Sequence, residues 1–382
     1  MNFTLVNSMR SAICTLATLG ALGAGSFSVC ALEVTATEVT QRSIYHSPEK
    51  PGYTAWCTLW RAKDGHLRLA FQQVTGPVQH PQQRTNVTVL LDSPDDALTW
   101  KVLREAPSRN NLAASTNGIY AAPADSSFCG HGLVALPNGT LVTGLWAGGG
   151  IDTGYIQRSE DDGQTWSPPI FLLDPKKYQT WPTVIRRLRD GRLILFAGVW
   201  ERESGKPPNP QLLKAMFQSE DDGRQWGRPI WVMPGRIGVC EESDFAELDG
   251  GELLFVHRTE HFEGEKYLHS DRWQGIVRPR GREWEVETPT KALFPHSGFP
   301  EVLKTREGVV LHVATDGIGW TADGGSHWGR LALPGSPYYP RACQLPDGRI
   351  LVVGHAGSDD VYGNKDQSIV QQTFRLGVKT GN

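Results

Sequence analysis

Short apolar runs recur along the chain in pairs, and each pair is separated by a brief turn of polar residues or glycine. Two runs joined in this way are typical of a β-hairpin. The intervals between successive turns are 40 to 74 residues, which leaves room for roughly four short strands and their loops. The pattern therefore predicts six successive sheet units. Their hairpin turns fall at Asp64, Asn138, Asp190, Asp249, Glu307 and Asp347.

A second repeat is an acidic turn that ends in tryptophan. The pattern S-x-D-x-G-x-T-W is complete from Ser159, and the copy from Ser219 lacks only the Thr. The copies from Thr321 and Ser93 keep the Asp and the Trp. Ser and Asp can bond their own backbone, Gly accepts positive φ, and the Trp can pack on a sheet. The ligand spacing of a calcium loop is absent. We therefore expect each acidic turn to lie at the outer rim of one sheet unit, or blade, with its Trp packed on that same blade.

Six sheet units, four of which carry an acidic turn, describe an all-β protein. The architecture that repeats a small antiparallel sheet in this way is the β-propeller. The sequence predicts a six-bladed β-propeller.

The first 31 residues differ from the rest. An uncharged, apolar run follows Arg10, and V-C-A at 29–31 offers small residues to a signal peptidase. A membrane anchor and a buried core helix are the alternatives. We predict that 1–31 is a signal peptide and that 32–382 is a single propeller domain, secreted or periplasmic. No later segment is apolar enough to span a membrane.

Charge and cysteine content limit the partners. The net charge is −3 and like charges are not clustered, so a nucleic-acid partner is not expected. The mature chain would keep four cysteines, none in a CxxC pair, so neither a metal site nor a cofactor is predicted. Free thiols are favoured over disulfides, and the oligomeric state stays open. The four are Cys57, Cys129, Cys240 and Cys343.

The central channel of a propeller is where a binding site is expected. The strand before each hairpin turn is expected to be the inner strand of its blade and to line the channel. Six or seven residues before the turn, the six inner strands are expected to lie at the same height along the channel. Several blades carry ionisable side chains there, namely His131, Glu242, Glu301 and Arg341. Trp181, Tyr338 and Tyr339 lie a step nearer the mouth, and aromatic faces suit sugar rings. The sequence predicts a polar pocket with aromatic walls that binds a glycan or oligosaccharide.

At this point the chain resembles a known family. The acidic turn resembles the Asp box of the sialidase-like propellers, and the resemblance extends over roughly residues 40–376. Glu242, followed by a strand, a DG turn and Arg258, is similar to the sialidase pattern. Tyr339, eight residues before Asp347, occupies the place of the family's nucleophilic tyrosine.

The resemblance implies that Tyr339 is the nucleophile and that Glu242 accepts its proton. A phenol has a pKa near 10, so it needs such an acceptor to attack. Arg258 would hold the substrate. The remaining predicted substrate-binding residues are Arg341, His131, Glu301 and Trp181.

The chain departs from the family elsewhere. Sialidases bind the substrate carboxylate with three arginines, but the first-blade segment GYTAWCTL and the fifth-blade segment VVLHVATDGIGW contain none. The loop AFQQVTGPVQHPQQR also lacks an acidic residue for the family's acid/base aspartate. An incomplete clamp predicts weak or absent activity on sialosides.

Three functions fit these observations. The first is an exported exo-glycosidase with sialidase-like retaining chemistry. The second is a lyase or another carbohydrate-active propeller acting on uronic-acid glycans, with His131, His296 or Tyr339 as acid or base. The third is a non-catalytic glycan-binding propeller that uses Trp181, Trp200 and the tyrosines as stacking platforms.

Overall fold

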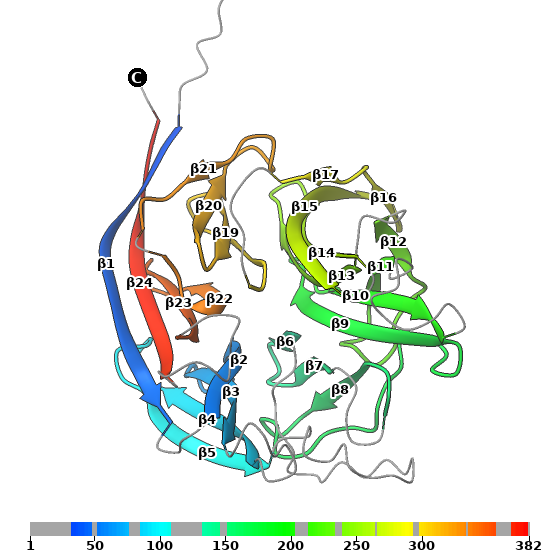
Figure 1. The fold of residues 1–382 in the computed structure, drawn as a ribbon, viewed down its shortest axis with the longest axis horizontal. Coiled ribbons are helices and arrows are strands. Elements are labelled where there is room, and N and C mark those ends of the chain that lie inside the picture. The colour runs from blue at the N-terminus through cyan, green and yellow to red at the C-terminus, as the bar shows by residue number, and fades with distance from the viewer. Residues whose placement is uncertain are drawn as a thin grey trace, which may run out of the picture.

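The computed structural model shows six antiparallel sheets arranged in a ring (Figure 1), which confirms the predicted six-bladed β-propeller. It describes residues 32–47, 52–75, 85–107, 132–145, 151–202, 213–233, 239–263, 266–292, 298–333, 335–356 and 368–380. The predicted signal peptide, 1–31, lies outside these ranges. Across the described ranges, no helix has the length and hydropathy needed to cross a membrane.

The sheets follow one another in chain order, and each is numbered here as a blade. Blade 1 contains β2 (Gly52–Arg61), β3 (Leu67–Thr75), β4 (Thr85–Ser93) and β5 (Lys101–Pro107), and blade 2 contains β6 (Gly132–Ala135), β7 (Leu141–Leu145) and β8 (Tyr155–Ser159). Blade 3 contains β9 (Tyr178–Arg187), β10 (Leu193–Glu201), β11 (Leu213–Ser219) and β12 (Ile230–Met233). Blade 4 contains β13 (Val239–Glu247), β14 (Leu253–Glu263), β15 (Lys266–Arg280), β16 (Glu283–Val286) and β17 (Thr290–Lys291). Blade 5 contains β18 (Glu301–Lys304), β19 (Val310–Ala314), β20 (Gly317–Thr321) and β21 (Gly329–Arg330). Blade 6 contains β22 (Tyr338–Gln344), β23 (Ile350–His355), β24 (Ser368–Thr380) and β1 (Leu32–His46).

The hydrophobic core is distributed between neighbouring blades. Side chains of β3 in blade 1, including Leu69 and Phe71, pack in one cluster with Leu351 and Val353 from β23 of blade 6. Similar clusters join blades 2 and 3, blades 3 and 4, and blades 5 and 6. Because each sheet buries both faces against its neighbours, the second strands of blades 3, 5 and 6 consist mostly of apolar residues.

The ring is closed by the first and last described strands. Leu32 to His46 in β1 pair antiparallel with Thr380 to Ser368 in β24, so the start of the domain supplies the outer strand of the last blade. Figure 1 shows the two strands side by side along one edge of the molecule.

Two of the four cysteines can be described. Cys57 in blade 1 and Cys343 in blade 6 are free thiols.

The predicted hairpin turns join the first and second strands of their blades. In four of the six, an Asp or Asn side chain accepts a hydrogen bond from the backbone N–H two residues later. These donors are His66, Thr140, Arg192 and Arg349, with donor–acceptor distances of 2.9 to 3.0 Å.

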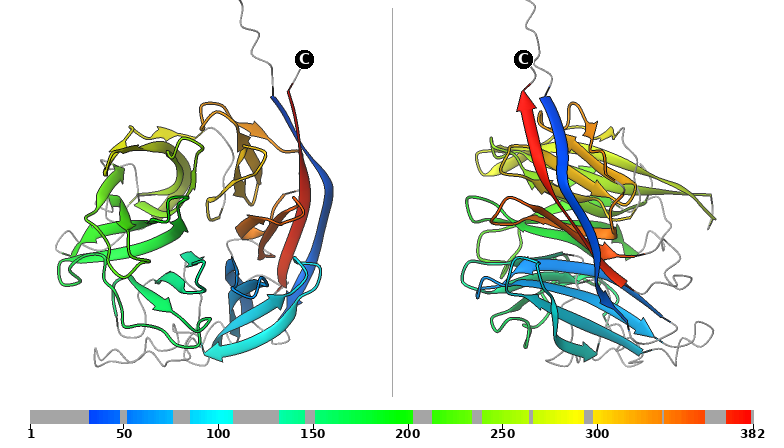
Figure 2. Two further views of the ribbon diagram at one scale, coloured as in Figure 1. Left: turned by 180° about the vertical axis from the view of Figure 1, so that it is seen from behind. Right: turned by 90° about the vertical axis from the view of Figure 1, so that its left-hand side faces the viewer.

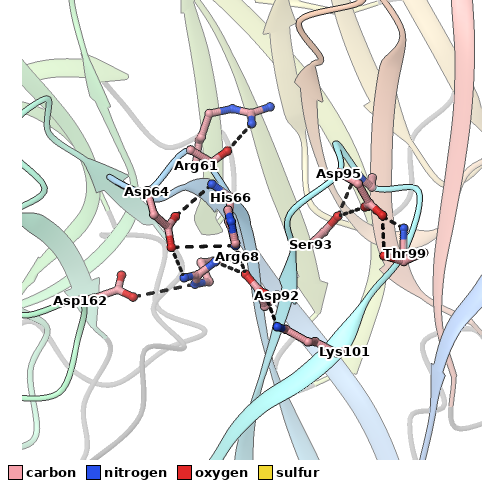
Figure 3. A network of polar contacts seen from close by, with 12 residues as sticks. Arg61, Asp64, His66, Arg68, Asp92, Ser93, Asp95, Thr99, Lys101 and Asp162 are labelled. Atoms are coloured by element: carbon pink, nitrogen blue, oxygen red, sulfur yellow. Dashed lines mark hydrogen bonds and ion pairs between the residues drawn. The ribbon is translucent and has the colours of Figure 1, made fainter.

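Each acidic turn follows the third strand of its blade and is held by its own side chains. The Ser159 hydroxyl accepts from Gly163 N at 2.7 Å and donates to the Asp161 carboxylate at 2.8 Å. Asp161 also accepts from Thr165 N and Oγ1 at 2.8 and 2.6 Å. Figure 3 shows the same arrangement at Ser93, Asp95 and Thr99 in blade 1.

The acidic turns also bind the preceding blade. In each one, a backbone carbonyl at the tip accepts a hydrogen bond from a side chain of the blade before it. The pairs are Gln371 to Ala97 at 3.1 Å, Arg104 to Gly163 at 3.3 Å, Arg158 to Asp222 at 3.0 Å and Gln274 to Gly325 at 2.7 Å. Figure 3 shows a further link of this kind, in which Asp162 of blade 2 faces Arg68 of blade 1, with 3.8 Å between the charged atoms.

The tryptophans of the acidic turns pack between two blades. The sequence had predicted that each would pack on its own blade. Trp166 belongs to a cluster that contains Trp60 and Leu90 of blade 1 and Leu141 of blade 2. The Trp328 indole donates to Gln274 of blade 4 at 2.6 Å, although its turn belongs to blade 5. The reason is that the turn tip itself lies against the preceding blade and carries its Trp into the interface.

Candidate active site

The candidate site lies at the end of the ring where the inner strands begin. The inner strands are β2, β6, β9, β13, β18 and β22, and each runs antiparallel to the second strand of its blade. Residues at the start of an inner strand therefore meet residues at the end of the second strand. The third strand is parallel to the first, so the acidic turns that follow it lie at the opposite end, away from this site.

Tyr339, Glu242 and Arg258 meet at this end. The Tyr339 hydroxyl donates to Glu242 Oε1 at 2.6 Å, and Arg258 Nη1 donates to Glu242 Oε2 at 2.8 Å. Arg258 Nη1 also lies 3.2 Å from the Tyr339 oxygen. Tyr339 is the second residue of β22 in blade 6, whereas the other two residues belong to blade 4. The contact therefore joins two blades that blade 5 separates in the sequence. Glu242 is buried and Tyr339 is half-buried.

The backbone of Tyr339 is in an unusual conformation. Its φ is +51°, in the left-handed region, and the pairing of β22 with β23 is irregular between Tyr338 and Arg341. A non-glycine residue in this region costs about 1–3 kcal/mol and is commonest at functional sites. Gly354 makes the bulge possible, because a Cβ there would lie 2.5 Å from the Tyr338 carbonyl oxygen. Glu242 lies in a similar irregularity of β13, between Cys240 and Ser243.

The charges around the pair set their protonation states. Burial raises the pKa of Tyr339 strongly, and the neighbouring Glu242 carboxylate raises it further, against the opposing effect of Arg258. The pKa of Glu242 is lowered: burial favours its neutral form, but the Arg258 charge and the hydrogen bonds outweigh burial. At neutral pH the tyrosine is thus protonated and the glutamate is ionised. This is a phenol whose proton already points at a base.

Two further charged residues complete the cluster, and the sequence analysis missed both. Glu260 accepts from Arg258 Nη2 at 2.5 Å. Arg272 is fully buried, pairs directly across from Arg258 in the β14–β15 ladder, and donates to the Gly298 carbonyl. Burial and then the Arg258 charge lower the pKa of Arg272 to about 10. Glu260 could have been found from the sequence, because it lies two residues after Arg258 and therefore on the same face of the strand. Arg272 could not, because an irregularity in the ladder between His261 and Phe262 shifts the pairing of the two strands.

His355 is a third residue that sequence reasoning missed. It ends β23, its ring stacks on Tyr339 with centroids 6.1 Å apart, and it meets Tyr338 edge-on at 4.9 Å. Burial lowers its pKa to about 4, so the ring is neutral at physiological pH. His355 therefore supports the aromatic wall behind Tyr339 without adding charge.

Glu301 and Arg341 lie in the channel itself. Arg341 Nη1 is 3.4 Å from Glu301 Oε2, and its guanidinium lies over the Phe299 ring. Glu301 also faces Arg186 at 3.6 Å, and Arg186 in turn binds Asp244. Burial, and secondarily the Asp244 charge, raise the pKa of Glu301 to about 7. These contacts connect the inner strands of blades 3 to 6.

The channel contains a small cavity, and the residues that line it include positions six residues before the hairpin turns. It has a volume of about 70 Å³ and includes residues from five inner strands. Among its lining residues are Thr58, Gly132, Val184, Glu301 and Arg341.

The remaining predicted site residues are placed as follows. Trp181 is half-buried on β9 and packs edge-on against Trp200, with centroids 4.3 Å apart. His131 and His296 lie outside the described residues. In blade 1, Gln72 and Gln73 are buried, and Tyr45 donates to Gln73 Oε1 at 2.5 Å.

Comparison with known proteins places this geometry in context. No protein-family model matches the chain, and no curated protein matches it in sequence. Among solved structures, a protein of unknown function from Dyadobacter fermentans has a TM-score of 0.65 at 18% identity, over 90% of this chain and 99% of that one. The Penicillium chrysogenum alpha-L-arabinanase has a TM-score of 0.60 at 16% identity, over 88% and 98%. The NanB sialidase from Streptococcus pneumoniae has a TM-score of 0.57 at 14% identity, over 87% and 70%.

The fold is that of the sialidase-like propellers. The sequence identities are low, so the comparisons establish architecture alone.

Proposed function

We propose that this protein is a carbohydrate-active enzyme, an exo-glycosidase with a tyrosine nucleophile. The observation that carries the proposal is the 2.6 Å hydrogen bond from the Tyr339 hydroxyl to an ionised, buried Glu242. Arg258 Nη1 at 3.2 Å from the same oxygen supplies positive charge where negative charge develops during attack. The fold shared with an arabinanase and a sialidase is consistent with glycan chemistry.

The reaction follows from the protonation states. Because the pKa of Tyr339 is raised, no phenolate is present in the resting enzyme. The Tyr339 oxygen would attack the anomeric carbon while its proton passes to Glu242, and the bond to the departing glycosyl oxygen would break. Water would then attack the anomeric carbon and release the sugar from Tyr339, with Glu242 returning the proton to the phenol oxygen. The proton that this water loses to solvent balances the one that the departing glycosyl oxygen takes from solvent. Glycosidases with a tyrosine nucleophile are a known exception to the two-carboxylate rule.

The site favours neutral sugars over sialosides. Arg258 already binds Glu242 and Glu260 through its two Nη atoms, and Arg341 binds Glu301. A substrate carboxylate would have to displace one of these protein carboxylates. The Tyr339 cluster also has no net charge, because its two guanidinium groups balance its two carboxylates. These groups belong to Arg258, Arg272, Glu242 and Glu260. We infer that the cleaved sugar carries no carboxylate.

We also infer that residues 1–31 act as a signal peptide and direct the enzyme out of the cytoplasm.

The test is a screen of purified protein against chromogenic neutral glycosides, sialosides and polysaccharides. The proposal expects release of a neutral sugar and little or no free sialic acid. A product with an unsaturated sugar, which absorbs in the near ultraviolet, would identify a lyase instead. Retention of glycan without turnover would identify a binding module.

A further inference from the structure

The β14–β15 hairpin carries a second cluster of ionisable side chains on the face opposite Arg258. Side chains alternate along a strand, so Arg258 and Glu260 share one face while Thr259 and His261 share the other. In the ladder, His261 pairs with His269, and Thr259 pairs with Asp271. In the right-hand view of Figure 2, this yellow-green hairpin extends beyond the other blades.

Both imidazoles point their Nε2 atoms at one carboxylate oxygen. His261 Nε2 lies 3.2 Å from Asp271 Oδ2, and His269 Nε2 lies 3.7 Å from the same atom. The rings stack with centroids 4.4 Å apart and an interplanar angle of 14°. One ligand atom from each of the three residues falls within 4.8 Å of the others. A tetrahedral ion with bonds of about 2.0–2.2 Å separates its ligand atoms by roughly 3.3 to 3.6 Å, which this arrangement approaches.

A neighbouring lysine orients the Asp271 carboxylate. Lys291 Nζ binds the other oxygen of Asp271, Oδ1, at 2.9 Å and thereby turns Oδ2 toward the imidazoles. Contacts of this kind orient a ligand without occupying its metal-binding atom. The Asp271 side chain is 13% exposed and that of His269 is 57% exposed, so the cluster is anchored on one side and open to solvent on the other.

We propose that His261, His269 and Asp271 form a binding site for a divalent transition-metal ion, with Zn²⁺ as the best fit. Imidazole nitrogen and carboxylate oxygen are ligands that zinc accepts, and three protein ligands leave a fourth position for water. The ligands come from both strands, so the ion clamps the hairpin whose other face carries Arg258 and Arg272. This departs from the sequence analysis, which predicted no metal, because the three residues converge only once the strands are in register.

The test is Zn²⁺ titration of chelator-treated, tag-free protein by calorimetry, with thermal unfolding as a second readout. The wild type is expected to bind one Zn²⁺ per chain and to unfold at a higher temperature with the ion present. His269→Gln and Asp271→Asn should weaken binding by at least about 10- to 100-fold and remove the stabilisation. Their melting temperatures without zinc report whether they fold.

His327→Gln is the matched control. His327 also faces a carboxylate, with Nδ1 at 2.6 Å from Asp323 Oδ2, but this pair is not part of a described three-ligand group. The control should bind Zn²⁺ as the wild type does. Absence of a one-to-one site in the wild type, or equal affinity in the folded His269 and Asp271 variants, would overturn the proposal.

Discussion

The chemistry proposed for Tyr339 depends on two side-chain contacts that its backbone conformation makes possible. Its left-handed φ of +51° places the residue in a bulge at the start of β22. There the hydroxyl reaches the Glu242 carboxylate, and Arg258 touches both groups. The strain of about 1–3 kcal/mol is compensated by the surrounding sheet. This conformation keeps the proposed nucleophile and its proton acceptor in contact before substrate arrives.

The pH dependence of activity should identify the essential base. Glu242 must be ionised to accept the phenolic proton, and although burial raises its pKa, the Arg258 charge and the hydrogen bonds lower it below that of an ordinary glutamate. We therefore expect kcat/KM to hold as the pH falls from neutrality and to decline only under more acidic conditions than would protonate an ordinary glutamate. An acid limb near pH 7 would instead assign the essential carboxylate to Glu301, whose pKa burial raises to about 7.

At the residue scale, the sequence predicted the parts of the site that can be counted from a turn. Tyr339 lies eight residues before Asp347, and Glu242 precedes its own turn in the same way. Arg272 could not be counted, because its position depends on the register of β14 with β15. The ion pair of Arg341 with Glu301 was also hidden, because the two residues come from neighbouring blades.

At the element scale, the acidic turn both shapes its own backbone and attaches to the preceding sheet. Its Ser and Asp side chains close the turn, while a carbonyl at its tip binds the preceding blade. Gln274 shows the attachment most clearly, since it donates to the Gly325 carbonyl and accepts from the Trp328 indole. The sequence predicted the turn but not its partner, because that partner belongs to another blade.

Asp161→Ala should lower stability without impairing the active site. It removes the bonds from Ser159 Oγ and from Thr165 N and Oγ1, which predicts a loss of about 1 kcal/mol or more in the free energy of unfolding. Urea unfolding measures this loss. Glu160→Ala, an exposed neighbour, is the control and should change stability little. A folded Asp161→Ala protein without activity would show that the turn has a catalytic role.

Gly223→Ala tests the packing of a turn against the preceding blade. Gly223 has φ +79° and a Cβ there would lie 2.9 Å from Val142 Cγ1. Gly65 has a similar φ, +85°, but a Cβ there meets nothing within 4 Å. Both variants should lose about 1–2 kcal/mol from backbone strain, and Gly223→Ala should lose about 1–3 kcal/mol more from overpacking. Equal losses in thermal or urea unfolding would argue against tight docking.

At the scale of the whole molecule, closure of the ring depends on residues far apart in the chain. The six predicted hairpins were enough to predict six blades, because each hairpin is formed by residues close together in the sequence. The pairing of β1 with β24 was not predicted, since it joins segments more than 300 residues apart and leaves no local pattern. That pairing covers the outer edge of blade 6.

A chain that starts at residue 47 should be much less stable than one that starts at Leu32. Removing β1 eliminates its ladder with β24 and exposes an unpaired strand edge. We expect a loss of more than about 3 kcal/mol, from several backbone hydrogen bonds, together with aggregation. Thermal unfolding and size-exclusion chromatography compare the two chains. Equal stability and a monodisperse shorter chain would show that β1 is dispensable for closure.

The most direct test of the proposed function is the turnover rate of Tyr339→Phe on whichever glycoside the wild type cleaves. The substitution removes one hydroxyl, so the melting temperature should stay close to that of the wild type while turnover is abolished. Glu242→Gln should behave similarly, because the phenol loses its proton acceptor. Full activity in a folded Tyr339→Phe protein would contradict the assignment of Tyr339 as nucleophile.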